Sequence, residues 1–150
     1  MIQELKDRVH NLFRETFMDT KNYHNYTKDM KPDQAASKRF MIDLTANEYM
    51  YINKETFKVS TAEDPKALEF VKFYLKGQSF LYNQIRKMVG CIVQVIHGQL
   101  DADHHMKNSF TNNGVLIALS PGDGLMLEKV GYDRYNEYNT QKKSDIMIQR

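Results

Sequence analysis

The sequence contains few of the residues that hold small extracellular or membrane proteins together. Cys91 is the only cysteine among the 150 residues, which excludes a disulfide framework and a cluster of thiolate metal ligands. Only 7 glycines and 3 prolines are present, and no apolar run is long enough to span a membrane. The first residues, Met1–Glu4, lack the apolar core of a signal peptide. We therefore expect an intracellular protein that makes no contact with a membrane.

Charge is balanced over the whole chain but not along it. The net charge of +2 is by itself too small to indicate a nucleic-acid partner. Residues 71–100, however, contain no acidic side chain and four basic ones: Lys72, Lys76, Arg86 and Lys87. Such a stretch could form a patch that faces phosphates. The alternative is a solvated face balanced by acids elsewhere in the fold, and charge alone favours this second interpretation.

Two stretches have the periodicity of amphipathic helices. In residues 2–17, apolar side chains recur at steps of three and four. A second helix is predicted over residues 79–96, where Ser79 can cap the start and Gly98 follows the end. Apolar side chains surround most of this helix, so it should be central and buried. Gly90 lies inside it, where glycine costs about 1 kcal/mol relative to alanine, and a close approach by another element would account for it.

Alternation of apolar and polar side chains predicts β-strands. Phe40, Ile42 and Leu44 share one face of a half-buried strand. The expected strands are residues 39–45 with a continuation at 49–52, residues 68–76 and residues 125–130. The remaining expectations are a short helix over residues 101–110 capped near Asp101, a turn at 120–124 and a polar, frayed tail at 139–150. Strands of this kind, separated by helices, indicate an α+β fold: an antiparallel sheet with helices packed on one face.

Arg86 is the most informative single residue, because it lies inside the most hydrophobic predicted helix. A guanidinium group keeps its charge, so its burial requires an anionic partner or several carbonyl acceptors. Positions 82, 83, 89 and 90, one turn away on the helix, hold no acid. The partner must then come from elsewhere in the fold, from another chain or from a ligand such as phosphate. Alternatively, Arg86 extends to solvent from the edge of the helix.

The irregular segment 22–28 contains amide, imidazole, phenol and ammonium groups in close succession. Aromatic rings interleaved with hydrogen-bonding groups are suited to unstacked bases and to the sugar–phosphate backbone. An ordinary polar loop anchored by Tyr23 and Tyr26 explains the same residues equally well.

Other residues with possible chemistry give weaker signals. His97, His104 and His105 include no pair at a spacing of four, so solvated histidines near a helix start explain them better than a metal site does. Cys91 lies on an apolar helix and is better explained as a small core residue than as a nucleophile. Neither a glycine-rich phosphate loop nor a Gly-x-Ser-x-Gly motif is present. We expect no metal and no cofactor.

Four blocks of the sequence together resemble a known family. Residues 77–90, GQSFLYNQIRKMVG, are similar to the helix signature of the TruA-type tRNA pseudouridine synthases, especially of their eukaryotic branch. Residues 22–27 resemble the family's His/Asn-aromatic motif, and residues 37–39 resemble the basic start of its next strand. Residues 124–132 resemble its closing strand. The resemblance extends over residues 8 to 136.

The resemblance implies an RNA isomerase, which breaks the glycosidic bond of a uridine, turns the base and rejoins it through carbon. In this family an aspartate in a Gly-Arg-Thr-Asp-type loop is the nucleophile, a tyrosine stacks on the flipped uridine, and a basic residue pairs with the aspartate. The last role corresponds to Arg86. The substrate would be RNA, in particular tRNA. The predicted RNA contacts are Asn22, His24, Asn25, Lys28, Arg39, Lys72 and Lys87.

The catalytic loop of the family is missing from this sequence, because no aspartate follows an Arg-Thr pair. We therefore interpret residues 1–138 as the C-terminal lobe of a two-lobed pseudouridine synthase fold, and expect it to be inactive without the N-terminal lobe. A non-catalytic RNA-binding or dimerisation module built on the same lobe is the main alternative, and a homodimer would fit it. A generic α+β ligand-binding domain is the third interpretation.

Overall fold

A computed structural model describes residues 3–132 and 135–140. The protein has an antiparallel four-stranded sheet with β2 at its centre. The first four residues of β2 pair with β1, its end pairs with β3, and β4 runs along its other edge. The strands are β1 (Asp19–Asn22), β2 (Lys38–Asn53), β3 (Val59–Ser60) and β4 (Ala67–Gly77). The predicted strands at 39–45, 49–52 and 68–76 are thereby confirmed as β2 and β4, whereas β1 and β3 were not predicted.

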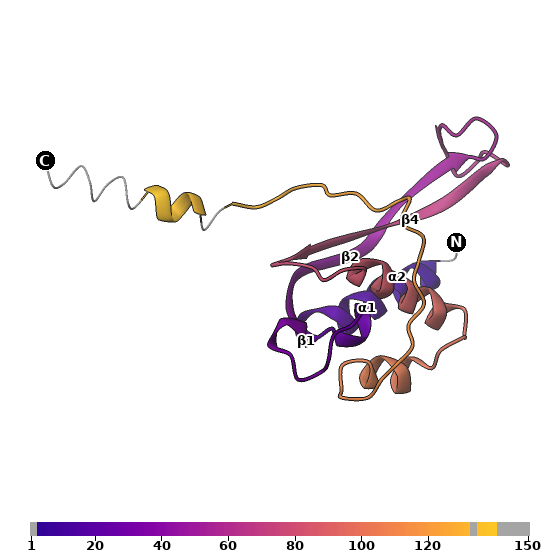
Figure 1. The fold of residues 1–150 in the computed structure, drawn as a ribbon. Helices are drawn as coiled ribbons and strands as arrows, with labels where there is room; N and C mark the ends of the chain where they lie inside the picture. Colours follow the sequence, from indigo (N-terminus) through magenta and orange to yellow (C-terminus); the bar gives the residue numbers. More distant parts are fainter. Residues whose placement is uncertain (1–2, 133–134, 141–150) are drawn as a thin grey trace, which may run out of the picture.

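The helices α1 (Gln3–Phe17) and α2 (Gln84–Ile96) pack together against one side of the sheet, and the far ends of β2 and β4 project beyond them (Figure 1). This arrangement confirms the predicted α+β class. A short π-helical turn, Ala102–Met106, follows α2, and the Asp101 side chain accepts a hydrogen bond from the backbone N–H of His104, as a cap should. Among the described residues, no helix is long and apolar enough to cross a bilayer.

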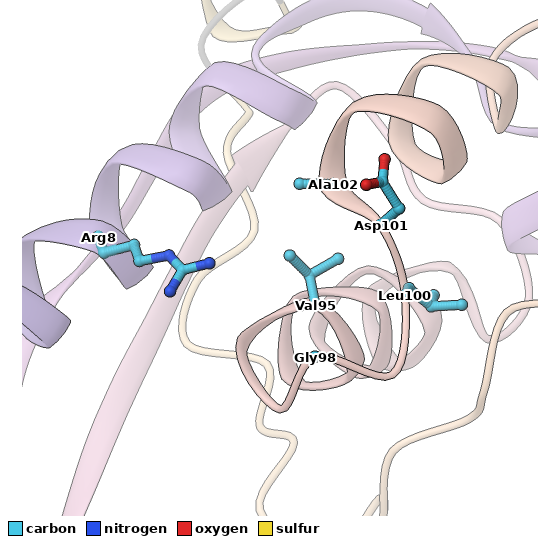
Figure 2. Close-up of a pocket in the computed structure, with 6 residues that line it drawn as sticks. All are labelled: Arg8, Val95, Gly98, Leu100, Asp101 and Ala102. Carbon is cyan, nitrogen blue, oxygen red and sulfur yellow. The ribbon is translucent and has the colours of Figure 1, made fainter.

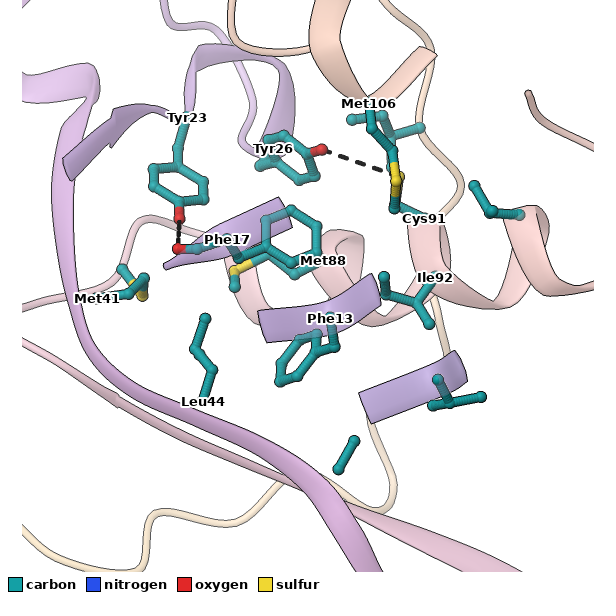
Figure 3. Close-up of a cluster of buried hydrophobic side chains, with 14 residues drawn as sticks. Phe13, Phe17, Tyr23, Tyr26, Met41, Leu44, Met88, Cys91, Ile92 and Met106 are labelled. Carbon is teal, nitrogen blue, oxygen red and sulfur yellow. Dashed lines mark hydrogen bonds between the residues drawn. The ribbon is translucent and has the colours of Figure 1, made fainter. Parts of the chain in front are cut away.

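Aromatic side chains form the centre of the core (Figure 3). The rings of Phe17, Tyr23, Tyr26 and Phe110 contact one another, mostly edge to face, and both tyrosines are completely buried. Each phenol has a partner, since Tyr23 donates to the Phe17 carbonyl and Tyr26 lies 2.7 Å from the Ser109 hydroxyl. Burial holds the pKa of both phenols well above the ordinary value. Segment 22–27 is therefore anchored by its tyrosines.

The first part of β2 does not present the face that alternation indicates. Met41 and Leu44 are completely buried, whereas Phe40 and Ile42 are 43% and 42% exposed. The pairing of β2 with β4 shifts register between Met41 and Asp43. An extra residue at such a bulge reverses the side-chain alternation beyond it. The expectation that Phe40, Ile42 and Leu44 share one face is therefore wrong.

The helix α2 begins later than predicted. Its first residue is Gln84, and Ser79 lies outside it. The preceding residue, Asn83, adopts a left-handed conformation with φ +59°, which breaks the helical path before Gln84. The buried Gln84 side chain accepts a hydrogen bond from the Leu81 N–H at 2.8 Å and stabilises the turn before the helix. At the other end, Gly98 has φ +68°, as predicted for a glycine that terminates a helix.

The predicted strand at residues 125–130 is wrong. These residues form no ladder with any strand of the described part of the chain, and they lead away from the sheet (Figure 1). A strand requires a neighbour that offers its backbone N–H and C=O groups, and alternation in the sequence cannot supply one. Residues 135–140 are helical, while residues 141–150 of the predicted tail lie outside the described ranges.

Gly90 is explained by a close approach, as predicted. A Cβ atom at this position would overlap the carbonyl oxygen of Ala118 and lie 3.1 Å from its carbonyl carbon. Segment 117–120 therefore passes directly over α2 at the one helical residue without a side chain.

Replacement of Gly90 by alanine should destabilise the protein by about 1–3 kcal/mol, because the new methyl group displaces Ala118. The intrinsic preference of helices for alanine predicts the opposite sign. Urea unfolding followed by circular dichroism measures the difference. Gly114→Ala is the matched control, since its Cβ meets nothing within 4 Å. A stabilised G90A variant would contradict the close approach.

An ion pair between α1 and β4 makes stability depend on pH. Lys6 Nζ lies 2.6 Å from Glu69 Oε1, and this hydrogen bond is the main cause that lowers the pKa of Glu69 to about 2. A depressed carboxyl pKa stabilises the folded state above the unfolded pKa of about 4.3, and the stabilisation is lost as pH falls toward 2. Glu69→Gln should therefore flatten the stability profile between pH 4.5 and 2 in thermal unfolding. Glu48→Gln, at an exposed ion pair, should leave that profile unchanged.

Candidate functional site

The start of α2 brings together three segments that are distant in sequence. Segment 22–28 contacts one side of the helix, and segment 118–122 contacts another. The Thr27 hydroxyl donates to the Tyr82 carbonyl at 2.9 Å and ties the first segment to the turn before α2. The backbone carbonyl of Arg86 accepts hydrogen bonds from the N–H and the hydroxyl of Ser120 and ties the second.

Arg86 is half-buried between α2 and segment 118–122. Its Nε donates to the Ser120 carbonyl at 2.8 Å, and its Nη1 lies 3.4 Å from the side-chain oxygen of Asn83. A Cβ atom at Gly122 would lie only 3.4 Å from the guanidinium carbon, so the group rests against that glycine. The side chain is therefore held by the Ser120 carbonyl, the Asn83 side chain and the contact with Gly122.

The two acceptors of Arg86 are neutral. Within residues 3–132 and 135–140, no carboxylate lies at ion-pair distance from its guanidinium. A guanidinium has five N–H donors, and only two of them have acceptors in the described part of the chain. The geometry is thus compatible with a carboxylate or phosphate that binds from outside, and the anionic partner of Arg86 stays a prediction.

Lys87, the next residue, points to the opposite segment. Its Nζ donates to the carbonyls of Asn25 at 3.0 Å and Thr27 at 3.1 Å. Burial lowers the pKa of Lys87 below its ordinary value. These bonds give Lys87 a structural role, since the ammonium satisfies two carbonyls of segment 22–28. Contact of Lys87 with RNA phosphate stays a prediction, for which one N–H donor is left over.

The polar side chains of segment 22–28 also support the fold. Asn25 Nδ2 donates to the carbonyls of Ser109 and Asn113, and its Oδ1 accepts from the N–H of Val115. Asn22 donates to the Pro32 carbonyl at 2.7 Å. Asn25 thus uses both of its amide N–H donors and its side-chain oxygen to hold residues 109–115 in place.

His24 combines burial with an unsatisfied atom. Its side chain is 7% exposed, and its Nδ1 lies 3.1 Å from Asn22 Oδ1. Its Nε2 is buried and has no hydrogen-bond partner within the described structure. Lys28, by contrast, is exposed and lies 3.7 Å from the Asp29 carboxylate. Of the predicted contacts in this segment, Lys28 is the one most accessible to a ligand.

The other predicted RNA contacts lie on the sheet. Arg39 follows the first residue of β2, opposite Lys21 of β1, and donates to the Lys38 carbonyl at 2.8 Å. Lys72 lies on β4 and pairs with Glu48 of β2 at 3.1 Å, a bond that raises the pKa of the lysine. The structure therefore places Asn25, Arg86 and Lys87 at the start of α2. Arg39 and Lys72 lie on the sheet instead, on β2 and β4 respectively.

Ser120 and Asn83 were not predicted as site residues, although both contact the Arg86 side chain. The sequence predicted a turn at 120–124 but did not indicate that Ser120 contacts Arg86. Gly90 was the available signal, because a glycine inside an apolar helix indicates that another segment crosses there. Nothing in the sequence indicated that this segment was the one that precedes the turn.

Residues outside this site have structural explanations. The Cys91 thiol is buried against the hydroxyl of Tyr26, and burial raises its pKa. No three His, Cys, Asp or Glu side chains of the described residues gather closely enough to hold a metal ion. A separate cavity lies between α1 and the end of α2, with Arg8 on one side and Asp101 on the other (Figure 2). None of the predicted site residues lines it.

Comparison with known proteins identifies the family. Residues 20–133 match the family model described as tRNA pseudouridine synthase. The pseudouridylate synthase 1 homolog of Mus musculus is 31% identical over 121 residues, which cover 81% of this chain and 25% of that protein. The pseudouridylate synthase 1 homolog of Homo sapiens is 28% identical over 145 residues, covering 90% and 31%. The tRNA pseudouridine synthase 1 of Yarrowia lipolytica is 28% identical over 118 residues, covering 79% and 20%.

The chain spans between a fifth and a third of the length of these curated relatives. The match covers the segments that form the candidate site: residues 22–28, the start of α2 and segment 118–122. On the strength of this match, the chain belongs to the tRNA pseudouridine synthase family.

Proposed function

We propose that this chain is one lobe of a uridine-isomerising enzyme that acts on tRNA, and that residues 1–138 form this lobe. The position of Arg86 carries the proposal. A guanidinium that is fixed against two neutral oxygens, with donors to spare, is suited to an anion supplied by another part of the protein. The names of the relatives support the reaction and the substrate.

In the proposed mechanism, Arg86 pairs with an aspartate of a second lobe. The nearby positive charge lowers the pKa of that aspartate and keeps it ionised, and a bidentate pair fixes its orientation toward the uridine. Ser120 and Asn83 keep the guanidinium in a fixed position, because they accept hydrogen bonds from its Nε and Nη1. Arg86 is then a positioning residue, and the aspartate is the catalytic one.

RNA would approach the surface near Lys28, with Lys72 and Arg39 as further phosphate contacts on the sheet. Phosphate contacts bring affinity and set the register of the RNA, without requiring that the cations lie at the reacting base. This division fits the structure, in which Lys72 and Arg39 do not converge on Arg86.

The 150-residue chain on its own should release no label from uridine-labelled tRNA, since none of its aspartates follows an Arg-Thr pair. Addition of a lobe that contains the aspartate loop should restore turnover. Formation of pseudouridine by the isolated chain would contradict the proposed role of Arg86.

In a protein that joins both lobes, Arg86→Leu should lower kcat by roughly 10²–10³, the usual effect of losing one preorganised electrostatic contact. Arg86→Lys should recover part of it, because the charge is kept but the bidentate geometry is lost. Single-turnover kinetics of pseudouridine formation measure these changes in rate.

Ser120→Ala is the control for stability, since it removes the hydroxyl that binds the Arg86 carbonyl and keeps the guanidinium. If Ser120→Ala reduces kcat as much as Arg86→Leu does, the arginine acts only through the fold.

Lys72→Gln should reduce the slope of log K against log salt for tRNA binding by about one unit, because one phosphate contact is lost. Glu48→Gln should leave the slope unchanged and raise affinity, since it frees Lys72 from its ion pair. Fluorescence titrations at several salt concentrations give both slopes. A slope that is the same in Lys72→Gln and wild type would make Lys72 an ordinary surface charge.

A further inference from the structure

The projecting end of the β2–β4 hairpin carries a second feature that none of the chemistry at α2 uses. Residues 53–58, which we call the hairpin tip, comprise the last residue of β2 and the turn that leads to β3. They lie at the end of the hairpin that extends away from both helices (Figure 1). No side chain of this tip belongs to the hydrophobic core.

The hairpin tip is a closed turn rather than a loose loop. The Asn53 N–H donates to the Lys58 carbonyl at 2.9 Å, and the Phe57 N–H donates to the Asn53 carbonyl at 2.8 Å. The side-chain oxygen of Asn53 also accepts from the N–H groups of Glu55 and Thr56. Asn53 therefore binds the N–H groups of Glu55, Thr56 and Phe57 and the carbonyl of Lys58.

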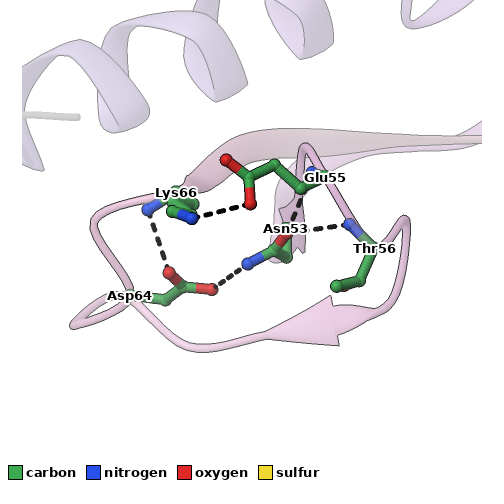
Figure 4. A network of polar contacts seen from close by, with 5 residues as sticks. All are labelled: Asn53, Glu55, Thr56, Asp64 and Lys66. Carbon is green, nitrogen blue, oxygen red and sulfur yellow. Dashed lines mark hydrogen bonds and ion pairs between the residues drawn. The ribbon is translucent and has the colours of Figure 1, made fainter.

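A second set of polar contacts joins the turn to Asp64 and Lys66, which precede β4 (Figure 4). The Asp64 carboxylate accepts from Asn53 Nδ2 at 2.8 Å, from the Ser60 hydroxyl at 2.6 Å and from the Lys66 N–H at 2.9 Å. These hydrogen bonds lower the pKa of Asp64, with the Ser60 hydroxyl as the main cause. Lys66 in turn pairs with Glu55 at 2.7 Å. The acids that lie closest to the turn are thus already engaged.

Phe57 is held in an unfavourable backbone conformation at this turn. Its φ is +55°, in the left-handed region where glycine and asparagine are the usual residues. Its side chain is 83% exposed, so no burial of the ring compensates for the strain. A turn built for glycine that instead presents a rigid, solvated aromatic ring indicates that the ring binds a partner.

The charges beside Phe57 indicate the kind of partner. Lys54 and Lys58 flank it in sequence, and neither has a carboxylate at ion-pair distance in the described structure. Each ammonium is therefore available to a phosphate. An exposed ring with unpaired lysines close to it in the sequence is suited to unpaired nucleotides, in which a base stacks on the ring and the phosphates contact the positive charges.

We propose that the hairpin tip is an RNA-binding site, in which Phe57 stacks on an unpaired base while Lys54 and Lys58 contact phosphates. The inference rests on the proposed function, because it presumes that the protein binds RNA. It adds a contact made by elements other than α2 and its neighbours. The stack would be tolerant of sequence, since every base has a face that can stack on phenylalanine.

Phe57→Gly in the 150-residue chain separates this role from a role in folding. Glycine prefers the conformation of residue 57, so the variant should be as stable as the wild type or more so. Its affinity for a single-stranded RNA that contains one 2-aminopurine should nevertheless fall about fivefold or more. Quenching of the 2-aminopurine fluorescence, which reports stacking, should be lost. Phe57→Trp should retain both.

Leu116→Ala is the matched control, since it removes another highly exposed apolar side chain and should change neither signal. Lys54→Gln and Lys58→Gln should each flatten the salt dependence by about one unit and leave the quenching in place.

Equal RNA affinity of Phe57→Gly and wild type would overturn the tip as an RNA site and leave the proposed function intact. Failure of the wild-type chain to bind any RNA would overturn both. If Phe57→Gly instead weakens self-association in sedimentation velocity and leaves RNA binding unchanged, the tip is an interface between two copies of the chain, which also overturns the proposal.

Discussion

The contact between α2 and the segment that crosses it at Gly90 determines the rest of the candidate site. Because no side chain separates them, the backbone at Ala118 lies directly on the helix, and two residues later Ser120 reaches the Arg86 carbonyl. The backbone carbonyl of Ser120 in turn accepts a hydrogen bond from the Arg86 guanidinium. Loss of the close approach would break the hydrogen bonds of Ser120 to the Arg86 carbonyl and to the Arg86 guanidinium. The packing at Gly90 therefore sets the position of the Arg86 charge.

Electrostatics give the two basic residues at the start of α2 different tasks. Arg86 has two neutral acceptors, keeps further donors and lies beside a glycine that leaves it room. Lys87 uses two of its three donors on the carbonyls of segment 22–28, and burial lowers its pKa. Adjacent cations would repel each other if they shared one face, but these two point to different segments. One cation supports the fold, and the other is suited to an external anion.

Periodicity predicted the elements that have a strong pattern: α1, α2, the long part of β2, and β4. It failed where a single backbone irregularity changes the outcome. The bulge near Met41 reverses which side chains are buried, and the left-handed Asn83 delays the helix start past Ser79. Neither event has a distinctive sequence signal, because asparagine and methionine occur in many other contexts. Arg86 was found because a permanent charge inside an apolar helix is conspicuous. Its contact Ser120 lies in a turn whose position depends on tertiary packing.

Within the described residues, four non-glycine residues have positive φ and show where the fold tolerates strain. Two are aspartates and one is Asn83, and the short polar side chains of these residue types can stabilise that conformation locally. Phe57 is the exception, since a bulky ring gains nothing from the left-handed region and is exposed there. Asn83 positions the start of α2 and contacts Arg86, so its strain is explained by the candidate site. By the same reasoning, the backbone hydrogen bonds of the turn explain why residue 57 is held at positive φ, but they do not explain why a phenylalanine stands there, and a role for its ring at the hairpin tip would.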